Sequence, residues 1–167
     1  MNPSHKQPSD PVYFIGPVTW DSVVGLIDQI RKRVPTEGLL EVVFSTTGGS
    51  QSAALGFCGW MKRFSRQQNV RAVASGQIAS AGITMFLAFD RRAADATSQF
   101  RFHLLSPDVE SDDAALKLLI KESEEQLVGL IKERTRLTEK IIRELMEERI
   151  PLSGDPLIRA GICNEQP

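Results

Sequence analysis

The chain has 167 residues, of which 41% are hydrophobic and 25% are charged, and its formal net charge is −1. This composition is typical of one compact globular domain and excludes a disordered or membrane-embedded chain. A net charge so close to zero supplies no overall field that would attract polyanions. We therefore expect no nucleic acid partner and no membrane partner.

The cysteines and the N-terminus indicate the compartment. Cys58 lies in an apolar helical pattern and Cys163 lies near the C-terminus, with no Cys-x-x-Cys pair and no histidine cluster that would build a metal site. We expect reduced structural thiols and no metal. The N-terminus lacks the apolar core of a secretory signal, and the longest apolar stretch, around residues 83–89, is far shorter than a membrane span. We expect a cytoplasmic protein.

After a polar tail over residues 1–11, two strand-turn-helix units follow each other. Residues 12–15 form a short apolar run that Gly16-Pro17 ends, and apolar residues then recur at helical spacing to Ile30. Residues 39–44 form a second run, which the turn Thr46-Thr47-Gly48-Gly49-Ser50 closes before a helical pattern over residues 53–64. Each unit predicts a strand that leads into an amphipathic helix.

A third unit begins with a short strand over residues 70–74, which the segment Gly76 to Gly82 turns into a helix over residues 83–89. That helix is apolar on most faces and therefore belongs in the core. Three such units in succession predict an α/β fold with a mostly parallel sheet, because parallel strands need long return connections. We expect residues 12–167 to form a single domain.

The second half of the chain is mainly helical. From Asp112 to Arg136 apolar and charged residues alternate in one long amphipathic pattern, which is longer than a small domain can cover and therefore predicts self-assembly. Thr138 is the expected N-cap of the next helix, and Pro151 lies just past its expected end. A short last helix begins at residues 153–156, with Gly161 as its C-terminal cap.

The two glycine turns and one histidine suggest a catalytic site. Gly49 lies where main-chain N–H groups can approach a ligand, and Ser80 begins a helix whose first N–H, that of Ala81, lacks an intrahelical partner. These two N–H groups can stabilise an oxyanion. Ser80 is the candidate nucleophile, and His103, at the end of a strand-like segment, is its candidate base, since His5 lies in the polar tail.

The order of these motifs resembles the proteolytic subunit of the Clp protease (ClpP). The segment Gly76-Gln77-Ile78-Ala79-Ser80-Ala81-Gly82 is similar to the family's Gly-Gln-Ala-Ala-Ser-Met-Gly, and residues 44–50 are similar to its Asn-Ser-Pro-Gly-Gly-Ser turn, with Thr47 in place of the proline. Phe102-His103 followed by Pro107 resembles the family's histidine segment, without its Gln-Pro pair. Residues 116–136 look like its handle helix.

The resemblance implies a ClpP/crotonase-like spiral of β-β-α units with a protruding handle helix. It implies a serine endopeptidase that cleaves peptides or unfolded proteins through an acyl-enzyme on Ser80, with His103 as base and Gly49 and Ala81 as the oxyanion hole. It also implies a homo-oligomeric ring and no cofactor. The family's AAA+ unfoldase is a less expected partner here, because only a short polar segment precedes Val12.

One position departs from the family. The aspartate that completes the family's triad lies three residues before a Leu-Ser pair, and here that position is Arg149. An arginine cannot accept a hydrogen bond from His103. Glu148, or Glu147 beside it, is the candidate third member. Two alternatives stay open: a non-catalytic ClpP-like ring subunit or scaffold, and a crotonase-type enzyme that uses the same oxyanion hole on an acyl thioester.

Overall fold

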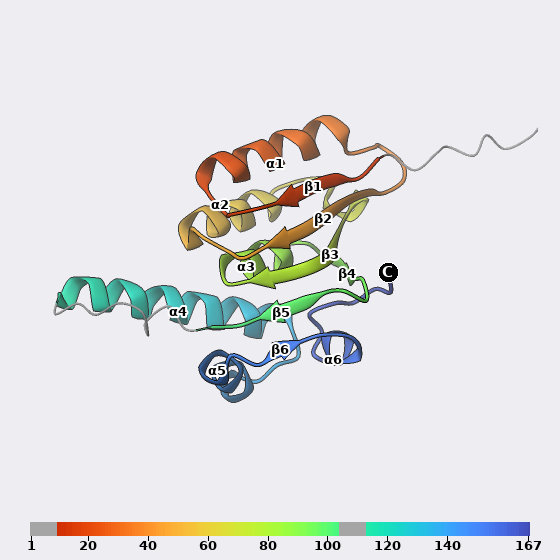
Figure 1. The fold of residues 1–167 in the computed structure, drawn as a ribbon. Coiled ribbons are helices and arrows are strands. Elements are labelled where there is room, and N and C mark those ends of the chain that lie inside the picture. Colours follow the sequence, from red (N-terminus) through yellow and green to blue (C-terminus); the bar gives the residue numbers. More distant parts are fainter. Residues whose placement is uncertain (1–9, 104–112) are drawn as a thin grey trace, which may run out of the picture.

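A computed structural model describes residues 10–103 and 113–167 of the chain. Residues 1–9 of the expected tail, including His5, and Pro107 of the histidine segment lie outside the described residues. Within the described ranges the strands join in one sheet with the order β1-β2-β3-β5-β6, and β4 pairs with β3 (Figure 1). The strands are β1 Val12–Ile15, β2 Leu40–Thr46, β3 Val70–Ala79, β4 Arg91–Ala94, β5 Gln99–Arg101 and β6 Pro151–Leu152.

The expected α/β fold with a mostly parallel sheet is confirmed. Strands β1 to β5 pair in parallel, and β6 joins β5 antiparallel. Every second residue of β1 and β2 is buried, because one face of the sheet lies under helices. Figure 1 shows these helices on the same face of the sheet. They are α1 Trp20–Arg33, α2 Gln51–Met61 and α3 Ala81–Leu87.

Helix α3 lies in the centre of the core, as its apolar composition predicts. All seven of its residues are buried. Phe86 of α3 packs edge-on against Phe44 of β2, at 6.1 Å between ring centroids, and against Phe100 of β5, at 5.0 Å. The nucleophile candidate at the start of α3 is therefore attached to a rigid helix.

The predicted end of the third strand is wrong. Instead of stopping at Ala74, β3 continues through Gly76 to Ala79. Gly76 adopts a φ of +79° and donates its N–H to Thr97 Oγ1 at 3.1 Å, and the pairing with β2 resumes after a register shift, with Thr46 opposite Ile78. The glycine therefore forms a bulge inside the strand and not a turn that ends it.

The extension of β3 allows it to pair with two strands in succession, and the first of these, β4, was not predicted. Residues 71–74 of β3 pair with β4, and residues 77–79 pair with β5. The Ala74 oxygen anchors the connection, because it accepts hydrogen bonds from the Asp95 N–H at 3.0 Å and from the Ser98 hydroxyl at 2.7 Å. The pattern Arg-Arg-Ala-Ala of β4 carries no hydrophobic alternation that would have revealed a strand.

The long helix α4, Ala114–Arg134, begins at the N-cap Asp113. Its buried residues, Leu127, Val128 and Ile131, all lie in its second half. Figure 1 shows the first half projecting past the sheet, and Leu116, Leu118 and Leu119 in that half are 37%, 57% and 60% exposed. The expected protruding helix is confirmed, and its free half carries apolar side chains into solvent.

A buried arginine holds the second half of α4 and the C-terminal segment to the core. Arg92 donates hydrogen bonds to the carbonyl oxygens of Phe89, Arg134, Gly161 and Ile162, at 2.5 to 3.2 Å. Burial, followed by the charge of Arg134, lowers the pKa of Arg92 to about 10, so the guanidinium is still charged at neutral pH.

Two helices complete the chain, α5 Glu139–Glu148 and α6 Asp155–Arg159. The predicted cap of α5 is confirmed, since the Thr138 side chain accepts a hydrogen bond from the Ile141 N–H. The predicted end of α6 is also confirmed, since Gly161 has a φ of +72° just after the last helical turn. Between the two helices, α5 ends at Arg149, which leads the chain into β6 beside β5.

Candidate active site

Ser80 lies in the sharp turn between β3 and α3, with φ 51° and ψ −128°. Such a positive φ is unfavourable for any residue except glycine, and a serine held there is typical of the strained strand-to-helix turn that exposes a nucleophile. The Ser80 side chain does not cap α3, so its hydroxyl is not used to start the helix. The sequence carried no signal for this conformation, because serine does not favour a positive φ.

The turn after β2 packs directly against Ser80. Gly48 has a φ of +99°, and a Cβ atom at this position would lie 2.6 Å from Ser80 Cβ and 2.8 Å from the Ala79 oxygen. No residue except glycine fits there without moving the backbone. Gly48, in the turn that is expected to face a ligand, is therefore required for a close contact with the candidate nucleophile.

Thr46 ties the same two turns together from the buried side. Its Oγ1 accepts a hydrogen bond from the Gly48 N–H at 3.0 Å, and its Cγ2 lies where a Cβ at Gly82 would approach to 2.3 Å. Gly82 is thus needed because Thr46 fills the space beside it. The two glycine-containing segments form one packed unit, although about 30 residues separate them in sequence.

The two candidate oxyanion donors belong to this unit. Gly49 forms a parallel bridge with Val18 that uses the oxygen of Gly48 and the N–H of Ser50, so the N–H of Gly49 itself points away from Val18. Ala81 is the first residue of α3, and its N–H therefore has no acceptor within the helix. Both N–H groups can donate to a ligand oxygen beside Ser80.

His103 reaches the site from the neighbouring strand. Ala79 pairs with Arg101 in the β3–β5 register, and the Ser80 N–H donates to the Arg101 oxygen at 3.4 Å. His103 follows Arg101 by two residues and is half-buried. The pairing of β3 with β5 thus brings the candidate nucleophile and the candidate base to adjoining strand ends.

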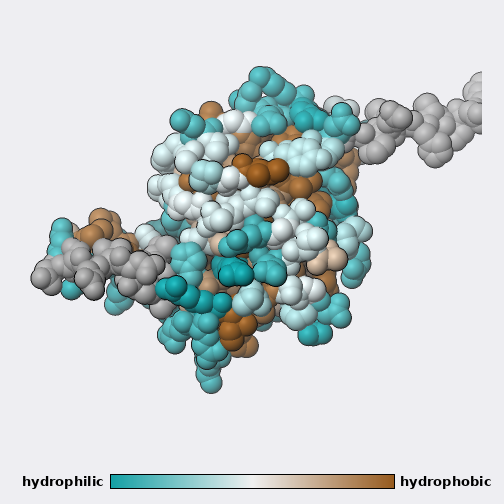
Figure 2. All heavy atoms as spheres, viewed as in Figure 1, coloured by the Kyte–Doolittle hydropathy of each residue, from teal (hydrophilic) through white to brown (hydrophobic). Residues whose placement is uncertain are grey.

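A pocket of about 290 Å³ opens beside these strand ends. Figure 2 shows strongly hydrophilic surface over the carboxyl ends of β3 and β5, in contrast with a hydrophobic patch over β1. Three of the lining side chains carry or can carry a positive charge, and none of the described lining residues has a carboxylate. The lining residues are Thr47, Gln77, Ala79, Arg101, Phe102, His103 and Arg149.

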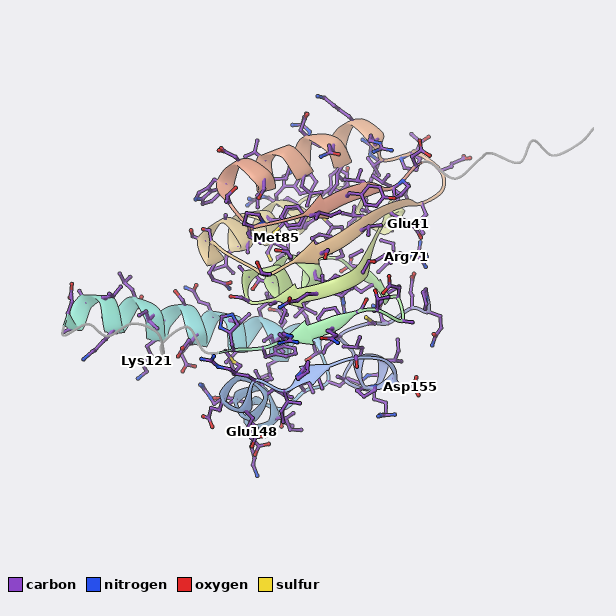
Figure 3. The ribbon with its side chains drawn as sticks, viewed as in Figure 1. Glu41, Arg71, Met85, Lys121, Glu148 and Asp155 are labelled. Atoms are coloured by element: carbon purple, nitrogen blue, oxygen red, sulfur yellow. The ribbon has the colours of Figure 1, made fainter. Side chains whose placement is uncertain are left out.

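Arg149, and not Glu148, lines this pocket. Strands β5 and β6 pair Arg101 with Pro151, two residues after Arg149. Glu148 is the last residue of α5 and is exposed (Figure 3). The structure thus places His103 and the residue that departs from the ClpP pattern in one pocket, which Ala79 lines and its neighbour Ser80 does not. The roles of Ser80 and His103, and of Glu148 as a third member, stay predictions.

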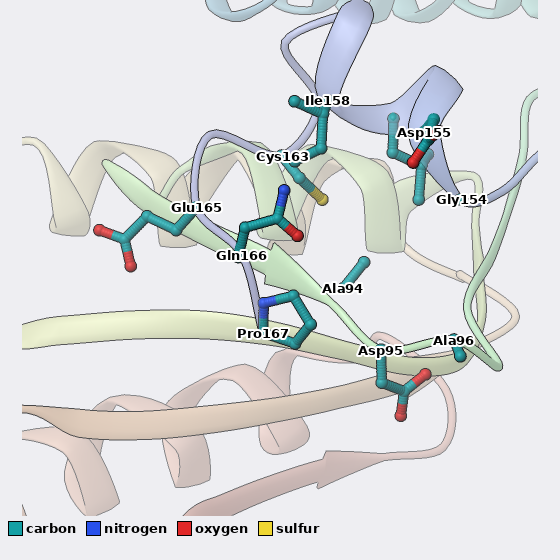
Figure 4. Close-up of a pocket in the computed structure, with 11 residues that line it drawn as sticks. Ala94, Asp95, Ala96, Gly154, Asp155, Ile158, Cys163, Glu165, Gln166 and Pro167 are labelled. Atoms are coloured by element: carbon teal, nitrogen blue, oxygen red, sulfur yellow. The ribbon is translucent and has the colours of Figure 1, made fainter.

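A second pocket, of about 270 Å³, lies near the end of β4 (Figure 4). Its ionisable lining side chains are acidic, Asp95, Asp155 and Glu165, apart from Cys163. Burial raises the pKa of Cys163 to about 12 and that of Cys58 to about 11, so both are thiols at neutral pH and neither is a thiolate nucleophile.

The described residues contain no group of three or more His, Cys, Asp or Glu side chains that could hold a metal ion. In the same part of the chain, no helix has both the length and the apolar composition needed to cross a membrane.

No protein-family model and no curated protein matches this chain. Solved structures do. ClpP1 from Listeria monocytogenes aligns with a TM-score of 0.78 at 21% sequence identity, over 94% of this chain and 90% of that chain. A mutant of the same protein with aspartate in place of an asparagine aligns with a TM-score of 0.79, at the same identity and coverage.

The chain has the ClpP fold. The expected ClpP-like spiral with its protruding helix is therefore confirmed. The match extends over nearly the whole chain.

The backbone of Ser80 leads to a prediction on stability. Ser80→Gly and Ser80→Ala both remove the hydroxyl, but only glycine relieves a strain of about 1–3 kcal/mol at this φ. Glycine also lowers the free energy of unfolding by about 0.4–1 kcal/mol, because its unfolded chain has greater conformational entropy. We expect Ser80→Gly to be more stable than Ser80→Ala by about 1 kcal/mol, which raises Tm by about 2–4 °C at equal protein concentration. A lower Tm for Ser80→Gly would show that the turn is unstrained.

Proposed function

We propose that this protein is a serine peptidase of the ClpP type, which hydrolyses peptide bonds through an acyl-enzyme on Ser80. The observation that carries the proposal is the strained turn at Ser80, which leaves the Ser80 hydroxyl out of the capping of α3. Strain at a non-glycine residue persists only where the surroundings impose it, and such residues cluster at active sites.

The proposed reaction follows from the position of each group. Ser80 Oγ attacks the carbonyl carbon of the peptide while an imidazole nitrogen of His103 accepts the hydroxyl proton. The N–H groups of Gly49 and Ala81 stabilise the negative oxygen of the tetrahedral intermediate. His103 then gives the proton to the leaving amine, and a water molecule, activated by the same histidine, hydrolyses the acyl-enzyme.

Arg149 lowers the expected rate. A cation beside His103 disfavours the imidazolium form that the mechanism requires, which is the reverse of the effect of a triad aspartate. Loss of the acid reduces kcat by about 10⁴ in a well-studied serine protease, and substantial catalysis over water remains. Within the proposal, Glu148 supplies the missing carboxylate only if its exposed side chain turns back past Arg149 toward His103.

The same arginine favours a second candidate function. A ring subunit or scaffold of the ClpP type that has lost catalysis would keep the fold and the glycine turns, whereas the residue at the position of the triad aspartate would be free to change. Arg149 occupies that position and lines the pocket where an acid would act. Nothing in the structure favours the thioester alternative over these two.

Labelling with a fluorophosphonate tests the peptidase, because this probe reports an activated serine without needing the natural substrate. We expect intact-mass analysis to show one adduct on the wild-type protein and none on Ser80→Ala. Ser153→Ala, which removes an exposed serine away from the pocket, is the matched control and should label as the wild type does. No adduct on folded wild-type protein would support the non-catalytic subunit.

Restoring the acid tests the role of position 149. Arg149→Asp removes the cation and introduces a carboxylate in the pocket that His103 lines. We expect this variant to raise the rate of fluorophosphonate labelling by about tenfold or more, because an aspartate orients the imidazole and stabilises its charged form. Arg149→Asn removes only the cation and should give a smaller increase. Equal labelling rates for Arg149→Asp and Arg149→Asn would show that the side chain at position 149 does not interact with His103.

We further propose that copies of this chain assemble through the first half of α4. Leu116, Leu118 and Leu119 are exposed there, within a helix whose second half is packed against the core. Association with a second copy would remove this apolar surface from water. The proposal includes no ATPase partner.

Light scattering tests the assembly. Leu119→Glu places a charge in the apolar half of α4, and we expect it to reduce the mass of the assembly at micromolar concentration. Lys121→Glu introduces the same residue two positions later, at an exposed polar site that is labelled in Figure 3, and should leave the mass unchanged. A monomeric mass for the wild-type protein would overturn the assembly.

A further inference from the structure

We propose that the pocket beside Ser80 selects a peptide ligand by binding a carboxylate between Arg101 and Arg149. This inference rests on the proposed function, because a peptide is the ligand that the Ser80 site would take. It adds the chemical class of the group that lies next to the reacting bond, which the ClpP fold alone does not determine.

The charge of the pocket is the first argument. Arg101 and Arg149 line it together with His103, and among the described residues no carboxylate lines it. Arg71, Arg91, Arg134 and Arg143 all pair with carboxylates elsewhere. Within residues 10–103 and 113–167, by contrast, Arg101 makes a side-chain hydrogen bond only to Gln99, and Arg149 forms no ion pair. In this part of the chain, neither guanidinium group is neutralised by a carboxylate.

The backbone of Arg149 is the second argument. Arg149 caps α5 with φ 55° and ψ 31°, a left-handed conformation that usually belongs to glycine or asparagine. Among the described residues, only Ser80 and Arg149 combine a side chain with a positive φ. Strain of this kind persists where function requires a defined geometry, and Arg149 lines the same pocket as His103 and Ala79, the residue before Ser80.

The position of the pocket is the third argument. Arg101, His103 and Arg149 all line it, and so does Ala79, the residue before Ser80. The Arg101 backbone accepts the hydrogen bond of the Ser80 N–H. The pocket therefore adjoins the turn that carries the proposed nucleophile.

The chemistry of the ligand follows from these positions. A guanidinium binds a carboxylate through two parallel hydrogen bonds, and a pocket of about 290 Å³ has room for an acidic side chain or a chain terminus. The bound carboxylate also neutralises Arg149, so the cation no longer opposes the charged form of His103. The ligand would then supply near His103 the negative charge that this chain lacks at position 149.

Two sources can provide the carboxylate: an aspartate or glutamate side chain, and the C-terminus of a peptide. Three peptides that carry a neutral fluorophore separate them. The first contains one glutamate and ends in an amide, the second contains glutamine and ends in an amide, and the third contains glutamine and ends in a free carboxylate. Binding is measured by fluorescence anisotropy with the Ser80→Ala protein, so that no peptide is cleaved.

We expect the first or the third peptide to bind at least about tenfold more tightly than the second, since a hydrogen-bonded charge contributes this much to affinity. Arg149→Asn, whose side chain tolerates the left-handed backbone, should abolish the difference, and Arg149→Lys should keep part of it. Arg159→Ala removes the same charge from α6, outside both pockets, and should keep all of it.

Three results would overturn the proposal: equal affinity for all three peptides, no binding of any peptide, or equal losses in Arg149→Asn and Arg159→Ala. These results are distinct from a failure of the proposed function. Selective carboxylate binding without fluorophosphonate labelling would overturn the peptidase and leave the pocket's selectivity intact. Labelling of Ser80 without a preference for carboxylate peptides would support the peptidase and overturn the proposed selectivity of the pocket.

Discussion

The contact between the Gly48 turn and the Ser80 turn determines the candidate site. Gly48 approaches Ser80 so closely that a Cβ would overlap it, and Thr46 occupies the space that a side chain at Gly82 would need. Two loops from different strand-turn-helix units can pack at this distance only because glycine occupies both contact positions. The N–H groups of Gly49 and Ala81 belong to this packed unit, and the bridge to Val18 further fixes the backbone of Gly49.

The pairing of β3 decides what surrounds this unit. Because β3 continues past the bulge at Gly76, its last residues pair with β5, and β5 in turn pairs with β6. His103 follows the first pairing by two residues, Arg149 precedes the second by two residues, and both line the same pocket. A strand that ended at Ala74 would have left the glycine unit without a histidine beside it.

Much of the fold could be predicted from the sequence, because hydrophobic spacing and glycine position reflect local geometry. The apolar pattern of α3 and the cap at Thr138 are examples, since each depends on residues within one or two turns. The length of β3 and the existence of β4 could not be predicted, because they depend on the hydrogen bonds that Gly76 donates to the distant Thr97 and that Asp95 donates to Ala74. Arg101 was missed as a pocket residue because only the folded arrangement shows that it shares a pocket with Arg149.

Among the described residues, the buried contacts of α4 lie in its second half. Its last turns are fixed by Arg92 and by the hydrogen bonds that Arg134 donates to Leu87 and Phe89, while its first turns have no buried residue. A stretch of helix this short is marginal in water without tertiary contacts, so we expect amide protection along α4 to rise from Asp113 toward Arg134. In the proposed assembly, part of the free energy gained when a second copy covers the leucines would then be used to order the helix.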